Sequence, residues 1–222
     1  PIRRQRQMCI RDRDLSDKIK QKYSKIDVLL NNAGGANKTK QITTEGLEKT
    51  FATNQMNYFV LSTELLEIIS ESNDGRIVNV ASNAHIGAEV DYENINSEKS
   101  FSAWTSYCVS KLMNIMFTYQ LSSIQDKVSV NVLHPGFVDT NIAGNEGNFI
   151  KYIVKLGAKM FARTVDSGAD SSIYLSTSDE VQNVSGKYFF KCKEIKSSRA
   201  SYNKEDWQKV WDLCNEYKIK LI

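Results

Sequence analysis

The chain has 222 residues, of which 41% are apolar and 10% aromatic, enough for one domain with a sizeable core. Its formal net charge is +3, and it shows neither an apolar run of membrane-spanning length nor a signal-peptide pattern. The four cysteines are scattered, without the spacing of a disulfide framework or a metal site, which favours a reducing, cytoplasmic compartment or the cytosolic face of a membrane.

The positive charge is concentrated at one end. Residues 1–13 hold five arginines and one aspartate, whereas residues 14–222 carry 24 basic and 25 acidic side chains. We expect residues 1–13 to be a foreign or disordered basic segment, because they show no apolar period, and residues 14–222 to form a single domain. No basic patch interleaved with aromatic residues occurs in the body, so nucleic acid is not expected as a partner.

The first predicted elements are a helix and a buried strand. Apolar residues at helical spacing among charges in residues 14–23 predict the end of a surface helix. Residues 26–30 form a short apolar run without alternation, typical of a strand buried on both faces of a parallel sheet. The strand leads into residues 31–35, and small residues there let a flat ligand approach the backbone; a simple turn explains this stretch equally well.

The longest helical pattern covers residues 44–69, with Thr44 as a candidate cap. Asn54 lies inside this pattern, although asparagine competes with the backbone for hydrogen bonds and suits a helix interior poorly. Residues 76–81 form a second buried-type strand that runs directly into Ser82. A hydroxyl at this end of a parallel strand lies where open α/β sheets bind ligands, and a serine that caps the next loop is the alternative.

The most informative stretch is Tyr107-Cys108-Val109-Ser110-Lys111, which opens a helical pattern over residues 107–121. A tyrosine and a lysine four residues apart lie on one face of a helix. An ammonium at about 4 Å stabilises a phenolate by roughly 4 kcal/mol at an effective dielectric near 20, which lowers the phenol pKa by about 3 units toward the range needed for proton transfer. Taken alone, the pattern is more typical of an ordinary amphipathic helix with an exposed lysine.

A stiff bend follows the third predicted strand, which covers residues 128–133. Pro135 lacks a backbone donor and fixes its own φ, and Gly136 permits a turn that other residues avoid. Val138 and Thr140 offer backbone and hydroxyl contacts beyond this bend.

The remainder of the chain is less specific. His134 is interpreted as structural, since no carboxylate or thiol motif accompanies it. Residues 141–165 are punctuated by glycine and then apolar, which suits a lid over an apolar pocket, a surface helix on the core or a membrane-facing helix. A helix over residues 166–176 that Asp166 caps, a strand over 185–190 and an amphipathic helix over 202–217 complete the predicted elements.

Strands that alternate with helices predict an α/β fold with a parallel sheet and helices on both faces. Four unusual features then fall on one rim of this sheet, three at strand carboxyl ends and one at a helix entry: Asn31 to Gly34, Ser82, Tyr107 and Pro135 to Thr140. That rim is where such sheets bind their ligands.

In their order and spacing, these pieces resemble the short-chain dehydrogenase/reductase family. Residues 97–104 and Gly186-Lys187-Tyr188-Phe189 are similar to its retinol-dehydrogenase-like branch in particular. The resemblance implies a three-layer, doubly wound Rossmann-type domain over residues 14–222. It also implies an oxidoreductase that transfers a hydride between NAD or NADP and a lipophilic alcohol or carbonyl compound.

The resemblance assigns roles to individual residues. Tyr107 would be the general acid in reduction and the base in oxidation, and Lys111 would hold the nicotinamide ribose and lower the tyrosine pKa. Ser82 would hydrogen-bond the substrate oxygen, and Asn54 would anchor a water that relays protons to Lys111. The cofactor-binding residues would be Asn31, Ala33, Gly34, Tyr107, Lys111, Pro135, Gly136, Val138 and Thr140.

One departure from the family pattern is clear, because no Gly-x-x-x-Gly-x-Gly or Gly-x-Gly-x-x-Gly sequence occurs anywhere in the chain. We therefore expect an N-terminally truncated copy that lacks the first strands and the glycine-rich phosphate loop. Its cofactor affinity should be severely weakened, it should have little activity, and the strand at residues 26–30 should become an exposed edge.

Two alternatives remain open. A non-catalytic binding module or pseudoenzyme is favoured by the missing loop and opposed by the intact set of Asn54, Ser82, Tyr107 and Lys111. A sugar-nucleotide epimerase shares the Tyr-x-x-x-Lys chemistry but usually carries a longer C-terminal domain. No metal is expected, and the substrate, the choice between NAD and NADP, and the oligomeric state do not follow from the sequence.

Overall fold

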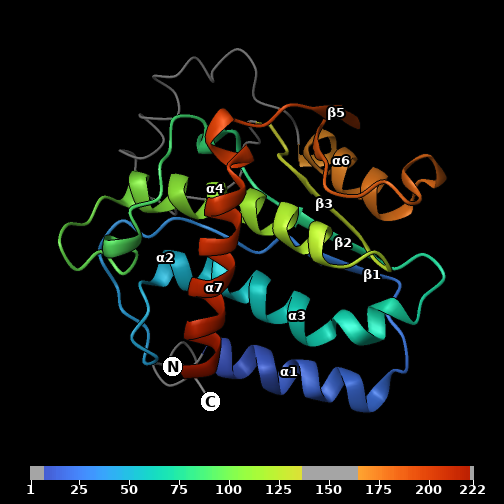
Figure 1. Ribbon diagram of the computed structural model, residues 1–222, viewed down its shortest axis with the longest axis horizontal. Helices are drawn as coiled ribbons and strands as arrows, with labels where there is room; N and C mark the ends of the chain where they lie inside the picture. The colour runs from blue at the N-terminus through green and yellow to red at the C-terminus, as the bar shows by residue number, and fades with distance from the viewer. Residues whose placement is uncertain (1–7, 137–164, 221–222) are drawn as a thin grey trace.

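The computed structural model describes residues 8–136 and 165–220. Its centre is a five-stranded sheet with the strand order β1-β2-β3-β4-β5, in which the first four strands are parallel and the last is antiparallel (Figure 1). The strands are β1 (Val28–Asn31), β2 (Arg76–Val80), β3 (Ser129–Leu133), β4 (Tyr188–Phe190) and β5 (Lys193–Ile195).

Helices cover both faces of the sheet. They are α1 (Met8–Lys22), α2 (Lys49–Phe51), α3 (Asn57–Ser70), α4 (Ala103–Ile124), α6 (Val165–Thr177) and α7 (Lys204–Lys220). Ile77 of β2 packs with α3 and α4, whereas its neighbour Val78 packs with Leu175 of α6. Because successive strand residues point to opposite faces, α6 lies on the side of the sheet away from α3 and α4.

The outer helices complete one of these layers. In Figure 1, α1 lies beside α3, and α7 crosses α4 at a steep angle. Trp211 of α7 packs between the two inner helices, with its ring 5.1 Å from that of Phe59 and 6.1 Å from that of Phe117. The predicted three-layer, doubly wound α/β fold is confirmed.

The predicted parallel strands are present with small shifts in their ends. All five residues of β2 are buried, as its largely apolar sequence predicts for a strand covered on both faces. The last parallel strand begins at Tyr188 rather than at residue 185. In the part of the chain that the structure describes, β1 pairs only with β2 and forms one edge of the sheet, and Leu30 on this edge is 42% exposed.

The long helix predicted over residues 44–69 begins later than expected. Its N-cap is Glu48, whose Oε2 accepts hydrogen bonds from the N–H groups of Thr50 at 2.9 Å and Phe51 at 3.0 Å. A buried carboxylate satisfies two N–H groups at once and suits the positive end of a helix, so the prediction of Thr44 as the cap is wrong. The helix is also interrupted by a π-helical turn over Ala52–Met56.

Two further expectations differ from the structure. Residues 8–13 form the first turns of α1, where Ser16 Oγ donates to the carbonyl of Asp12 at 2.8 Å, so the prediction of disorder is wrong for this part of residues 1–13. Helix α6 begins at Val165, which places Asp166 inside its first turn rather than at its cap.

The predicted lid or surface helix over 141–165 lies almost wholly outside the described residues. No helix among the described residues is long and apolar enough to cross a membrane.

Candidate active site

The candidate site lies at the carboxyl edge of the parallel strands. Ser82 follows the end of β2, and Tyr107 lies in the second turn of α4, which packs on β3 and β2. Ser102 caps α4 by accepting the N–H of Thr105 at 3.3 Å, and this cap sets where the helix begins and which face Tyr107 presents.

The side chains of Ser82 and Tyr107 are hydrogen-bonded to each other. The Ser82 oxygen accepts the N–H of Ala84 at 3.2 Å, and the serine hydroxyl donates to the phenol oxygen of Tyr107, which acts to lower the pKa of that phenol. Burial has the larger effect and raises the pKa of Tyr107 overall. Ser82 therefore acts directly on the Tyr107 phenol, which places the two side chains in one site.

Lys111 lies one helical turn beyond Tyr107 and is almost fully buried. Its ammonium donates to the carbonyl of Val80 at 2.8 Å and lies over the ring of Tyr58, 5.4 Å from the centroid. Removal from water lowers the pKa of Lys111 to about 7.

The expected electrostatic effect of Lys111 on the phenol is not present in the described structure. The pKa of Tyr107 is raised, and Lys111 is not among its causes. The physical reason for the raised pKa is burial of the phenol, which is the largest of its causes.

Asn54 holds the turn after β1 against α4. It lies in the π-helical turn, and its amide accepts the N–H of Gly35 and donates to the carbonyl of the same residue, both at 2.9 Å. The amide also donates to Ser110 Oγ at 2.9 Å, and Ser110 Oγ donates to the carbonyl of Tyr107 at 2.7 Å. Asn54 thus links the rim turn to the helix that carries the tyrosine.

Asn114, which was not predicted as a site residue, donates a hydrogen bond to the backbone carbonyl of Asn54. Its Nδ2 donates to that carbonyl at 2.8 Å and to Gln55 Oε1 at 2.9 Å, while its Oδ1 accepts from Lys111 Nζ at 3.4 Å. A side-chain amide therefore bridges Asn54 and Lys111. Its position three residues after Lys111, on the same helical face, is the signal that could have indicated it.

The turn after β1 packs directly on these groups. A Cβ at Gly34 would lie 3.1 Å from Asn54 Oδ1 and 3.2 Å from Lys111 Nζ. Ala33 and Gly34 are exposed on the rim. The side chain of Asn31 instead points into the fold, where its Nδ2 donates to Ser62 Oγ at 2.9 Å and Asn79 Oδ1 at 2.8 Å.

The bend after β3 is present as predicted. Gly136 has a φ of +83°, which a residue with a side chain rarely adopts, and its N–H donates to His134 Nδ1 at 3.2 Å. The His134 ring stacks on Phe190 with a centroid distance of 4.2 Å, in agreement with a structural role. Pro135 is half-buried beside this turn, and the predicted contacts of Val138 and Thr140 lie outside the described residues.

The described residues fit the nicotinamide half of a dinucleotide. An open strip of backbone at Ala33 and Gly34 lies against Lys111 Nζ, and a methyl group at Gly34 would crowd this amine and Asn54 Oδ1. A flat ligand could therefore approach the amine and the hydroxyl pair. Lys111 and Tyr107 would hold this half, and the sequence contains no glycine-rich motif for the pyrophosphate.

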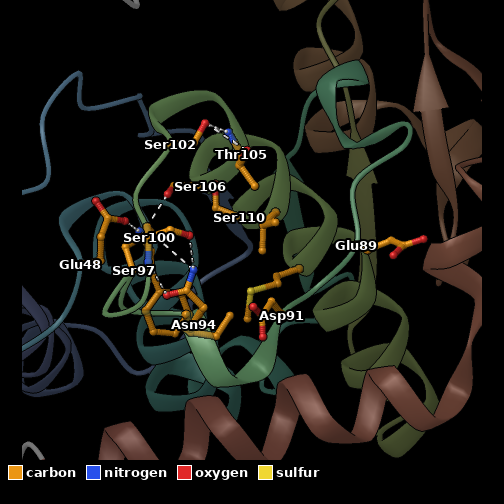
Figure 2. Close-up of a pocket in the computed structure, with 14 residues that line it drawn as sticks. Glu48, Glu89, Asp91, Asn94, Ser97, Ser100, Ser102, Thr105, Ser106 and Ser110 are labelled. Carbon is orange, nitrogen blue, oxygen red and sulfur yellow. Dashed lines mark hydrogen bonds between the residues drawn. The ribbon is translucent and has the colours of Figure 1, made fainter.

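A separate hollow of about 130 Å³ lies on another side of α4 (Figure 2). Ser106 and Ser110 line it from the helix, and Glu48 and Ser97 line it from neighbouring segments. Ser82, Tyr107 and Lys111 are not among its lining residues, so it is distinct from the candidate site.

The comparisons with known proteins point in one direction. A sequence model of the family described as short chain dehydrogenase matches residues 11–150. Retinol dehydrogenase 14 of Homo sapiens is 35% identical over 206 residues, which cover 91% of this chain and 61% of the relative. Polyprenol dehydrogenase of Homo sapiens is 32% identical over 207 residues, covering 90% of this chain and 63% of the relative. The chain thus spans less than two thirds of the length of these relatives.

Solved structures show the same fold. An uncharacterized protein from Mycobacterium Paratuberculosis superimposes with a TM-score of 0.74 at 24% identity, over 96% of this chain and 73% of that one. A gluconate 5-dehydrogenase from Burkholderia cenocepacia, solved in complex with NADP and tartrate, gives 0.61 at 18% identity, over 83% and 71%.

Proposed function

We propose, since the chain belongs to the short-chain dehydrogenase family, that it interconverts a lipophilic alcohol and its carbonyl compound with NAD or NADP. The observation that carries this proposal is the hydrogen-bonded pair of Ser82 and Tyr107, with Lys111 one helical turn away at the rim of a parallel sheet. Similarity to retinol and polyprenol dehydrogenases supports a lipophilic substrate.

The geometry suggests how the residues would share the work. A substrate oxygen placed between the two hydroxyls would accept a hydrogen bond from each. Tyr107 would then give its proton to the oxygen in reduction, or take one in oxidation, while Ser82 stabilises the charge that develops there. When bound, a nicotinamide dinucleotide supplies or accepts the hydride.

Lys111 would contribute through charge and position. With a pKa of about 7 in the free protein, its amine is only partly charged near neutral pH. A ligand that hydrates or hydrogen-bonds this amine from the Gly34 side would favour its charged form, which in turn favours the phenolate of Tyr107. The expected lowering of the tyrosine pKa is therefore proposed for the ligand-bound protein.

A paired assay tests the proposal. The protein is incubated with retinol and either NAD or NADP in excess, and retinaldehyde is followed by chromatography, beside Tyr107→Phe and the control Tyr23→Phe, which alters a half-exposed tyrosine outside the site. We expect the wild type and Tyr23→Phe to form the aldehyde at equal rates and Tyr107→Phe to form none. Cofactor-saturated, folded protein that turns over no lipophilic alcohol or aldehyde would contradict the proposal.

A further inference from the structure

His85 is a buried histidine three residues after Ser82, and the proposed mechanism does not use it. It ends a 3-10 turn over Asn83–His85 and is 1% exposed. Its Nδ1 lies 2.7 Å from the carbonyl oxygen of Ser82, and its Nε2 lies 3.0 Å from the backbone nitrogen of Ser198. Both ring nitrogens therefore have a backbone partner, one on each side.

These partners determine which nitrogen carries the proton. A backbone N–H can only donate, so Nε2 facing Ser198 must be an acceptor without a proton. A carbonyl can only accept, so Nδ1 facing Ser82 must carry the proton and donate it. Only the neutral Nδ1–H tautomer satisfies both contacts, because an imidazolium would turn a second N–H toward the N–H of Ser198. Burial of His85, which lowers its pKa, acts in the same direction.

The far end of this bridge is well anchored. Ser197 Oγ lies within 2.8 Å of the Tyr119 hydroxyl on α4 and within 2.6 Å of Ser201 Oγ. Trp207 of α7 donates from its indole nitrogen to the carbonyl of Ser201 at 2.6 Å. The segment around Ser198 is therefore tied to the same helix, α4, that carries Tyr107.

The ring itself is also held in place. It packs edge-on against Tyr188 of β4, with the ring centroids 5.3 Å apart. A histidine fixed by one aromatic ring and two backbone groups has little freedom to rotate, so it transmits the position of the Ser198 segment to the backbone of Ser82.

We propose that His85, as the neutral Nδ1–H tautomer, is a positioning residue that holds Ser82 toward Tyr107 by bridging the Ser82 carbonyl to the N–H of Ser198. Its effect on turnover rests on the proposed function, whereas the tautomer and the bridge do not. The bridge aligns the serine hydroxyl with the phenol without touching substrate or cofactor.

The tautomer can be read directly by long-range ¹⁵N–¹H NMR of histidine-labelled protein at pH 7.5. The chain has two histidines, and the second provides an internal control. Gly136 donates its N–H to Nδ1 of His134, which requires the proton of that ring to be on Nε2. We expect the Nδ1–H pattern from His85 and the Nε2–H pattern from His134. The Nδ1–H pattern should be lost in His85→Asn. An Nε2–H or cationic His85 would overturn the bridge.

Two variants test positioning. His85→Asn keeps an amide that can donate to the Ser82 carbonyl and loses the Nε2 acceptor, whereas His85→Leu loses both contacts. We expect amide hydrogen exchange at Ser198 to accelerate about tenfold in both variants, as the loss of one hydrogen bond implies. Unchanged exchange in both would overturn the bridge, whether or not the protein shows turnover.

Turnover provides the final readout. We expect kcat to fall about tenfold in His85→Leu and to be partly restored in His85→Asn, with cofactor Kd unchanged in both. A kcat equal to wild type in His85→Leu would contradict positioning of Ser82 by this bridge. A wild type without turnover instead contradicts the proposed function, and the NMR and exchange results then still decide the bridge.

Discussion

The hydroxyl of Ser82 donates a hydrogen bond to the phenol of Tyr107, and this contact joins the end of a sheet strand to a helix that follows much later in the chain. The pair sits where four parallel strands end together. A substrate oxygen placed between the two hydroxyls would accept a hydrogen bond from each, so that both groups are paired in the complex.

Ser82→Ala should remove one of the two donors to the substrate oxygen. We expect kcat to fall by about 10²–10³, the usual effect of removing one oxyanion donor, with little change in thermal stability. The control is Ser106→Ala, which removes a hydroxyl from the same helix as Tyr107 but faces Ser97 at 3.5 Å. Steady-state kinetics that show equal losses in both variants would argue against a role specific to Ser82.

Gly34→Ala should disturb the site, and Gly35→Ala should not. A Cβ at Gly34 would press on Asn54 Oδ1 at 3.1 Å and Lys111 Nζ at 3.2 Å, whereas a Cβ at Gly35 meets nothing within 4 Å. We expect cofactor affinity, measured by quenching of tryptophan fluorescence, to weaken several-fold in Gly34→Ala alone. Identical titration curves for the two variants would remove Gly34 from the proposed cofactor surface.

Lys111 should make the folded protein more stable as the pH rises from 7 to 9. Its pKa is about 7 in the folded protein and near its ordinary value of 10.5 when unfolded, so the unfolded chain binds more protons over this interval. The free energy of unfolding should therefore increase by about 2 kcal/mol from this residue alone. Urea unfolding at the two pH values should show this increment in the wild type but not in Lys111→Met. Equal pH dependence in the two proteins would mean that the amine keeps its ordinary pKa.

Asn114→Ala should destabilise the protein, because Asn114 is fully buried and holds two other buried residues. It would leave the carbonyl of Asn54 and the amide oxygen of Gln55 without their donor, and both residues are fully buried. The expected cost is about 1–3 kcal/mol in the free energy of unfolding. The exposed Asn83→Ala provides the control, and a similar loss there would show that the effect is not due to the buried bridge.

The fold was largely readable from the sequence because its signals are local. Short runs rich in valine, isoleucine and leucine marked β1, β2 and β3, as expected for strands covered on both faces. The same rule located Ser82, because the rim of a parallel sheet begins where such a run ends. The short antiparallel β5, which is fully exposed, carries no apolar pattern and was not predicted.

What the sequence could not show depends on contacts between distant segments. Glu48 replaces Thr44 as a helix cap because its carboxylate is buried there, which only the packed structure reveals. The contacts of His85 could not be predicted either, because its second partner, Ser198, lies more than a hundred residues further along the chain. The spacing of Tyr107 and Lys111 along the helix predicted a lowered pKa for the phenol. The pKa is raised instead, because burial of the phenol has the largest effect.

The most direct test of the account is the turnover of Tyr107→Phe in a protein that still binds cofactor. The substitution removes only the phenol hydroxyl, so the buried ring and its packing with Trp104 are retained. The account predicts that the oxidation of a lipophilic alcohol and the reduction of its aldehyde both fall to background while cofactor Kd changes less than about twofold. Turnover retained in Tyr107→Phe at a rate near that of the wild type would contradict it.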